Sequence, residues 1–125
     1  MINKNLAIAQ IAKKVRPVIR RLVNKGFDTQ KDPYGAKWDE TKTGQKFDKD
    51  NGLQQSITVN ATTDSVTVKT SKFYTLYHQD GTTHLPSRKI VPTSIGNNTW
   101  DKPIKKVIDK EIAKVLADVK QSGKG

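Results

Sequence analysis

The spacing of apolar residues changes twice along this chain of 125 residues. At both ends apolar residues recur every three or four positions, as in an amphipathic helix, and in the middle they alternate with polar residues, as in a β-strand. Because the strand-like segments follow one another without an intervening helix, the pattern favours an antiparallel sheet. We therefore predict an α+β fold, with an antiparallel sheet of three to four strands covered by N- and C-terminal helices.

Residues 1–26 predict a basic amphipathic helix. At 100° per residue, its apolar side chains from Ile8 to Val23 fall within an arc of about 140°. Pro17 removes one helical hydrogen bond, which predicts a bend or two helical pieces, and Gly26 predicts the end of the helix. The segment carries seven basic residues and no acidic residue. The side opposite the apolar arc holds six of the seven: Lys13, Lys14, Arg16, Arg20, Arg21 and Lys25.

Four short segments between the two helices have the composition of strands. Apolar and polar residues alternate over 57–59 and again over 66–68, and the turn-forming residues between them predict a β-hairpin. Residues 73–79 are aromatic and β-branched, which predicts a third strand. Residues 88–91 predict a short fourth strand that ends at Pro92.

The C-terminal segment returns to the spacing of a helix, with Pro103 in the first turn and Thr99 or Asp101 as the N-cap. Its other side mixes lysine with acidic residues, as a solvated face does. The length is that of one domain. We therefore predict a single domain over 1–125, made of a basic amphipathic helix at 1–26, a long loop at 27–52, an antiparallel sheet at 53–99 that includes a loop at 77–92, and a C-terminal helix at 100–125.

The first long connection is polar and has neither a helical nor a strand period. Loops of this length in a compact domain are usually functional or disordered. This one contains the turn residues Asp32, Pro33 and Gly35 and the large aromatic residues Tyr34 and Trp38. The two aromatic side chains either dock the loop onto the chain's own sheet or anchor a partner subunit.

The second long connection covers residues 77–92. Gly81 marks the tip of this loop, and Pro86 and Pro92 stiffen its exit. The planar guanidinium of Arg88 can fork onto a carboxylate or onto a set of backbone carbonyls.

The residues of the chain argue against catalysis. There is no cysteine, hence no disulfide, thiolate metal site or cysteine nucleophile. The spacing of His78, Asp80 and His84 fits no metal-ligand pattern, and the segment from Asp48 departs from a calcium loop. A nucleophile elbow, a phosphate-binding loop and an apolar run long enough to span a bilayer are all missing from the sequence. We predict no enzyme, no cofactor, no metal site and no membrane contact.

The formal net charge of +11 predicts a polyanionic neighbour. The basic side of the N-terminal helix lies against DNA, against an acidic protein or in plain solvent. Lysine and arginine without interleaved aromatic residues suit a sequence-blind contact with phosphates.

Short motifs follow one another between residues 27 and 95. They are Phe27, then Asp32-Pro33-Tyr34-Gly35 with Trp38, then Gly52-Leu53 with Ser56-Ile57, then Tyr77-His78-Gln79 with Gly81, and finally Pro86-Ser87-Arg88 with Pro92. In their order and spacing the chain resembles the phage virion morphogenesis family, the small tail-completion or neck proteins of Mu-like and related tailed phages. That family also has a helix on either side of these motifs.

The resemblance implies a structural virion protein without catalysis or cofactor, at the neck or the head-proximal end of the tail and assembled in the bacterial host cytoplasm. It implies a ring homo-oligomer, a hexamer in the family, that joins other neck, connector or tail proteins and lets double-stranded DNA pass. The basic side of the N-terminal helix is then the DNA-proximal face. The alternative is a stand-alone basic domain that binds nucleic acid without sequence preference. Subunit-interface or loop-setting roles are predicted for Asp32, Pro33, Tyr34, Gly35, Trp38, Gly52, Leu53, His78, Gly81, Pro86 and Arg88.

Overall fold

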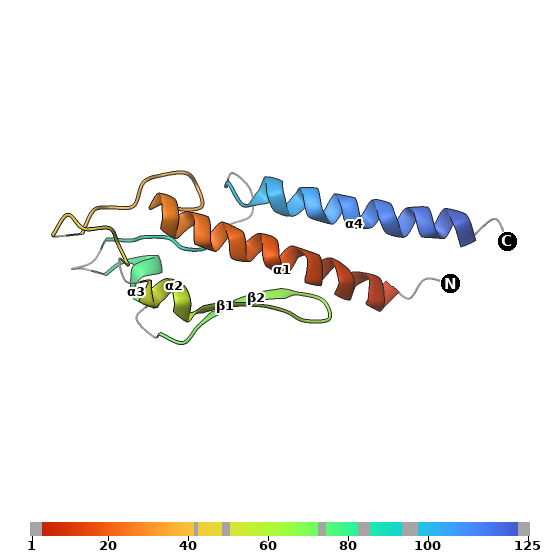
Figure 1. Ribbon diagram of the computed structural model, residues 1–125, viewed down its shortest axis with the longest axis horizontal. Helices are drawn as coiled ribbons and strands as arrows, with labels where there is room; N and C mark the ends of the chain where they lie inside the picture. Colours follow the sequence, from red (N-terminus) through yellow and green to blue (C-terminus); the bar gives the residue numbers. More distant parts are fainter. Residues whose placement is uncertain are drawn as a thin grey trace.

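The computed structural model describes residues 4–41, 43–48, 51–72, 75–82, 86–93 and 98–122. Two long helices, α1 and α4, run side by side, and the hairpin lies on the other side of α1 (Figure 1). The connecting loops gather at one end of the molecule (Figure 1). In chain order the elements are α1 (Lys4–Thr29), α2 (Gly52–Ser56), β1 (Ile57–Ala61), β2 (Val66–Thr70), α3 (Thr75–Asp80) and α4 (Asp101–Ser122).

The N-terminal helix ends three residues later than the sequence predicts, at Thr29. α1 passes through both Pro17 and Gly26 as one helix. Of the two alternatives at Pro17, two helical pieces are therefore excluded, and the predicted stop at Gly26 is wrong. Packing on two sides of α1 offsets the hydrogen bond that Pro17 removes. The chain turns back just after the helix at Gln30, whose φ of 58° is left-handed. A Cβ atom at residue 26 would lie 3.3 Å from the Lys31 carbonyl oxygen, so this glycine permits a close approach of the chain.

The predicted hairpin is confirmed. β1 and β2 pair antiparallel, with Val59 opposite Val68 and Ala61 opposite Val66. The Thr62 amide donates a hydrogen bond of 2.8 Å to the Ser65 carbonyl and closes the turn. The α+β class is therefore confirmed, whereas the described part of the chain holds a sheet of two strands, not three to four.

The predicted third and fourth strands are wrong. Residues 75–80 form the short helix α3, and Phe73, the first residue of the predicted third strand, lies outside the described residues. Residues 88–91 are irregular because side chains bond their backbone. Gln79 Oε1 accepts hydrogen bonds from the backbone amides of Ile90 and Val91 at 2.7 and 3.1 Å. These groups are therefore already bonded and cannot join a ladder.

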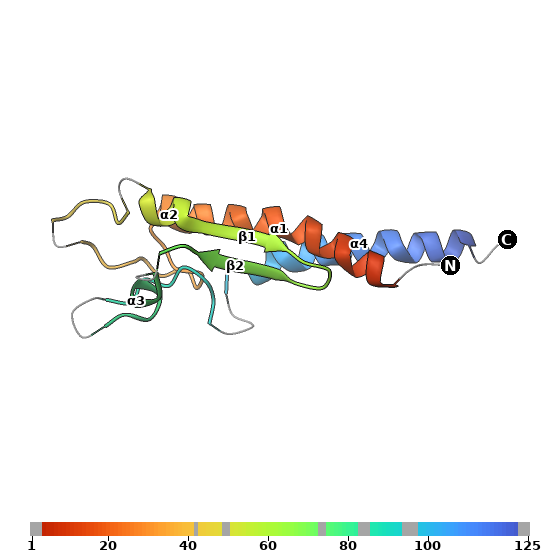
Figure 2. The ribbon, with the colours of Figure 1, turned by 90° about the horizontal axis from the view of Figure 1, so that it is seen from below.

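The layers also differ from the prediction. α1 alone covers the hairpin, and α4 packs on α1 rather than on the sheet (Figures 1 and 2). The predicted sheet covered by both helices is therefore a stack of hairpin, α1 and α4.

The N-terminus of α4 is capped one residue earlier than predicted. Asn98 Oδ1 accepts hydrogen bonds from the amides of Trp100 and Asp101 at 2.9 and 3.1 Å, so Asn98 is the capping residue. Thr99 instead donates to the Pro33 carbonyl through its amide and its hydroxyl, at 2.6 and 2.7 Å. This pair of bonds ties the first long loop to the start of α4.

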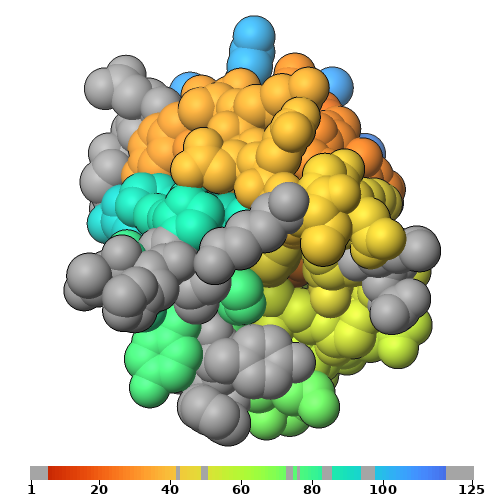
Figure 3. All heavy atoms as spheres, turned by 90° about the vertical axis from the view of Figure 1, so that its left-hand side faces the viewer, coloured from red at the N-terminus to blue at the C-terminus, as the bar shows by residue number. Residues whose placement is uncertain are grey.

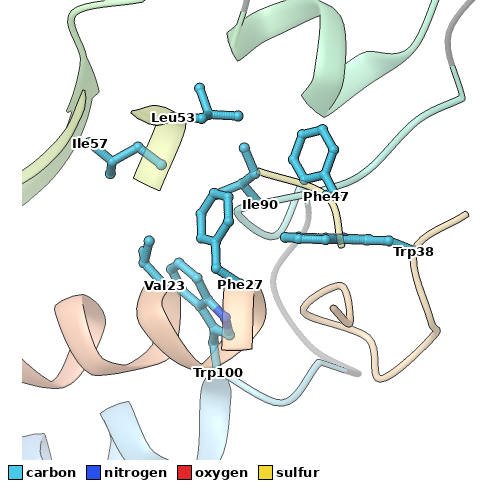
Figure 4. Close-up of a cluster of buried hydrophobic side chains, with 8 residues drawn as sticks. All are labelled: Val23, Phe27, Trp38, Phe47, Leu53, Ile57, Ile90 and Trp100. Carbon is cyan, nitrogen blue, oxygen red and sulfur yellow. The ribbon is translucent and has the colours of Figure 1, made fainter. Parts of the chain in front are cut away.

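The core sits at the loop end of the molecule, and the first long loop supplies two of its aromatic rings. Trp38 packs edge-on against Phe27 of α1 and against Phe47, with ring centroids 5.3 and 5.5 Å apart. Edge-to-face contacts of this kind add to the stabilisation from burial. The cluster in Figure 4 consists of Val23, Phe27, Trp38, Phe47, Leu53, Ile57, Ile90 and Trp100.

Candidate functional site

The two long loops meet at one end of the molecule. In Figure 3 the first loop, in orange, lies directly against residues 86–93, in cyan. Trp38 joins them, because its Nε1 donates a hydrogen bond of 3.0 Å to the Lys89 carbonyl. The side chain is only 6% exposed. Little of the ring is therefore left for a partner. Trp38 docks the loop onto the chain's own fold, but its ring contacts are to Phe27 of α1 and to Phe47 and not to the sheet that was predicted.

Arg88 forms the second link between the loops. Its Nε donates to the Asp39 carbonyl at 3.0 Å and its Nη2 donates to the Glu40 carbonyl at 3.3 Å. The guanidinium carbon lies 4.7 Å from the centre of the Phe47 ring, a cation–π geometry. Arg88 is 4% exposed, and the predicted fork is confirmed on backbone carbonyls.

His78 lies beside this link. Its ring is 4.8 Å from that of Phe47, and its carbonyl accepts a hydrogen bond of 2.6 Å from the Arg88 amide. Burial, and then the positive charge of Arg88, lower the pKa of His78 below its usual value, and the Asp48 carboxylate opposes this effect only in part. Its surroundings therefore favour the neutral form of the imidazole.

The turn at residues 32–36 is built by the predicted turn residues. Asp32 Oδ1 accepts hydrogen bonds from the amides of Tyr34 and Ala36, each 2.9 Å long. Gly35 has a φ of 91°, which an L side chain rarely adopts. The Tyr34 hydroxyl accepts a 3.1 Å bond from the Thr93 amide. Asp32, Gly35 and Tyr34 thus set the loop and tie it to the second loop.

The other predicted loop residues also lie at this end. Leu53 is buried in the core, and its amide donates to Asp48 Oδ1 at 2.8 Å. Gly52 begins α2, and Gly81 ends α3 with a φ of 79°. Pro33 is buried and Pro86 is half-buried.

Two glutamines hold the loops as a neighbouring strand would: Gln79, which belongs to one of the short motifs, and Gln30, which belongs to none of them. Gln30 Oε1 accepts from the Phe47 amide at 2.8 Å, and Gln30 Nε2 donates to the Phe47 carbonyl at 3.2 Å. Gln79 does the same to Val91, with bonds of 3.1 and 2.8 Å. Gln30 lies in a polar segment, where no pattern in the sequence distinguishes this role from that of a solvated glutamine.

A basic ridge of Lys14, Arg21 and Lys25 runs along the exposed side of α1. At 1.5 Å per residue it spans about 16 Å. Lys13 and Arg16 are exposed as well, but at 100° per residue they lie about 100° and 160° around the helix from the ridge. The ion pairs of the described residues lie within α4, so none of these five side chains has an acidic partner there.

Arg20 is the exception on the basic side of α1. It is half-buried, and its Nη1 donates to the Ile57 carbonyl at 2.6 Å while its Nη2 reaches the Gln54 carbonyl at 3.4 Å. Arg20 therefore anchors the hairpin to α1 and is not part of the ridge.

Within the part of the chain that the structure covers, histidine and carboxylate side chains form no cluster that could hold a metal ion. A pocket of about 250 Å³ between the end of α1 and the start of α4 has Leu22, Trp100 and Pro103 in its wall, and its carboxylate, Asp32, is bonded to backbone amides. None of the described helices combines the length and the apolar character needed to cross a membrane.

Comparison with known proteins returns no match among family models, curated proteins or solved structures.

Proposed function

We propose that the protein is a structural component of a tailed phage virion, a tail-completion or neck protein that works as a ring of identical subunits. The observation that carries this proposal is that the motifs behind the resemblance converge at one end of the fold. Trp38 bonds Lys89, Arg88 bonds the backbone at residues 39 and 40, and Tyr34 bonds Thr93. These residues stiffen two surface loops without forming a reactive site, as a protein that works by surface fit requires.

Exposed apolar side chains supply surface for such assembly. Leu6, Ile112 and Leu116 on the two long helices are 58, 42 and 55% exposed, and Tyr77 on α3 is 50% exposed. Burying large apolar side chains between subunits stabilises an assembly by about 1.5–3 kcal/mol for each fully buried one. The neighbours would be further copies of the chain and other neck, connector or tail proteins.

The basic ridge suits passing double-stranded DNA in this setting. Three unpaired cations along about 16 Å attract phosphates without reading bases. Such a contact weakens as salt rises, and it therefore suits a duplex that moves past.

The test uses a tailed phage that encodes this protein. Without the protein, we expect filled heads and finished tails to accumulate unjoined in electron micrographs, and the wild-type chain should restore joining. The variant Leu116→Glu should fail to restore it while unfolding at the same urea concentration as the wild type. Lys110→Glu changes an exposed residue on the same helix and serves as the matched control. Normally joined particles in the absence of the protein would contradict the proposal.

A stand-alone nucleic-acid-binding domain is the second candidate, and the basic ridge favours it. Binding to duplex DNA across a salt series separates the two, because this candidate requires micromolar affinity or better at physiological salt. Replacing Lys14, Arg21 and Lys25 together by glutamine should lower the slope of log affinity against log salt by about 2.7, since each phosphate contact contributes about 0.9. Arg20→Gln should lower stability and leave that slope unchanged. Millimolar binding by the wild type would reject this candidate.

A further inference from the structure

The outer edge of β2 is an open row of backbone hydrogen-bonding groups. In an antiparallel ladder, pairs of residues that bond each other alternate with pairs whose backbone groups point outward. Two bonds show which pairs are the bonded ones: the Ser71 amide donates to the Ser56 carbonyl, and the Thr62 amide donates to the Ser65 carbonyl. The backbone groups of Val66, Val68 and Thr70 therefore point away from β1. Among the described residues these outward groups have no backbone or side-chain partner. β2 also forms the side of the hairpin turned away from α1 (Figure 2).

A pocket adjoins this edge. It has a volume of about 130 Å³ and lies where the end of β2 faces α3, with Val68, Ile57, Ile90 and Val91 among its lining residues. Gln79 closes one wall, and the amide of this side chain makes three hydrogen bonds to residues 90 and 91. An apolar cavity of about this size accepts a group as large as benzene, hence one branched aliphatic side chain.

We propose that the edge of β2 and this pocket together bind an extended segment of another protein, in which acidic and apolar residues alternate. A strand added to β2 places every second side chain on the inner face of the hairpin, where Val66 and Val68 lie with β1 residues Val59 and Ala61 opposite them. One of those side chains enters the pocket. The side chains between them lie on the outer face beside Lys69, where an acidic residue forms a favourable cross-strand pair.

Charge decides between a foreign segment and a second copy of this chain. β2 and the residues after it carry Lys69 and Lys72, both exposed, and the whole chain has a net charge of +11. The edge of β1 in a second copy would bring no carboxylate to Lys69, and its Ile57 carbonyl already accepts a bond from Arg20. An acidic partner therefore fits better than self-pairing. This site does not depend on ring assembly or on a virion, so it goes beyond the proposed function.

The test uses a synthetic six-residue peptide in which glutamate alternates with valine and leucine, and a matched peptide with lysine in place of glutamate. The glutamate peptide should bind the full-length protein and slow hydrogen exchange at the amides of Val66, Val68 and Thr70, whereas the lysine peptide should not bind. Replacing its leucine by alanine should weaken binding about tenfold, because the pocket then stays empty. Methylating the peptide amides on the side that faces β2 should abolish binding, and methylating the opposite side should not.

Charge variants of the protein complete the experiment. Lys69→Glu should weaken binding about fivefold. Lys14→Glu makes the same change of charge on the distant surface of α1 and should leave the affinity unchanged. The proposal is overturned if the peptide fails to bind at 1 mM, or if both variants weaken binding equally, which would indicate general electrostatic attraction. Slow exchange at the same three amides in a peptide-free dimer would also overturn it, because a second copy would then occupy the edge.

Discussion

Removing the Arg88 guanidinium tests whether one buried cation holds the two loops together. In Arg88→Met a side chain of similar length remains, but the two bonds to the carbonyls of residues 39 and 40 and the stacking on Phe47 are lost. A hydrogen bond from a charged donor contributes about 1.5–3 kcal/mol. Because Asp39 and Glu40 are exposed, water replaces part of each bond, and about 1 kcal/mol apiece is the appropriate value.

The expected total follows from these contributions. With about 1 kcal/mol more for the cation–π contact, Arg88→Met should lower the free energy of unfolding by about 3 kcal/mol. Arg88→Lys keeps the charge but not the fork, so it should lose about half as much. A domain of this size has a total stability of about 5–15 kcal/mol, so both losses are easily measured.

Urea unfolding at pH 7, followed by tryptophan fluorescence, provides the assay. Trp38 and Trp100 both lie in the core cluster and report its exposure to water. Arg21→Met on the basic ridge is the matched control and should change the free energy of unfolding by no more than about 0.5 kcal/mol. If Arg88→Met and Arg21→Met cost the same, the loops are held by something other than Arg88.

Three further predictions concern the same end of the molecule. Gln79→Leu leaves two backbone amides without an acceptor, so it should lower the free energy of unfolding by about 2–4 kcal/mol. Hydrogen exchange at the amides of residues 90 and 91 should become faster. Unchanged exchange there would show that Gln79 does not hold this segment. Trp38→Ala should lower the free energy of unfolding in urea by about 3–5 kcal/mol, and Trp38→Phe should lower it clearly less. A Trp38→Ala protein as stable as the wild type would instead favour the interpretation that Trp38 contacts a partner subunit. The lowered pKa of His78 means that the unfolded chain binds the proton more readily, so stability should be complete above about pH 6.5 and fall as the pH drops toward the folded-state pKa. His78→Gln should remove that part of the pH dependence, and an identical pH profile in the variant would show that another group is responsible.

The parts of the fold predicted from sequence are those with a local period. α4 and the hairpin each repeat one spacing over enough residues to identify the element, and the turn after Ala61 has suitable residues. α1 was identified for the same reason, but its end was not. Gly26 is a plausible terminator in sequence, whereas in the structure it allows the chain to pass closely over the helix.

The loops and the missing strands could not be predicted because long-range contacts determine them. Residues 75–79 have strand composition, yet as a helix they direct Gln79 onto residues 90 and 91, whose backbone then has no need of a strand. Phe47 is a single aromatic residue in a polar segment, and only the folded chain shows it between Arg88 and Trp38. For Arg88 the sequence left a carboxylate and a set of backbone carbonyls open as acceptors, and the structure shows the carbonyls of residues 39 and 40.

The position of α1 between the hairpin and α4 has a consequence for biosynthesis. α1 is translated before α4, so the side of α1 that receives α4 stays uncovered while the residues between the two helices leave the ribosome. The hairpin can dock earlier, on the opposite side. A nascent chain arrested before α4 therefore exposes the apolar side of α1 that α4 later covers. A chaperone can bind this side until α4 has been made.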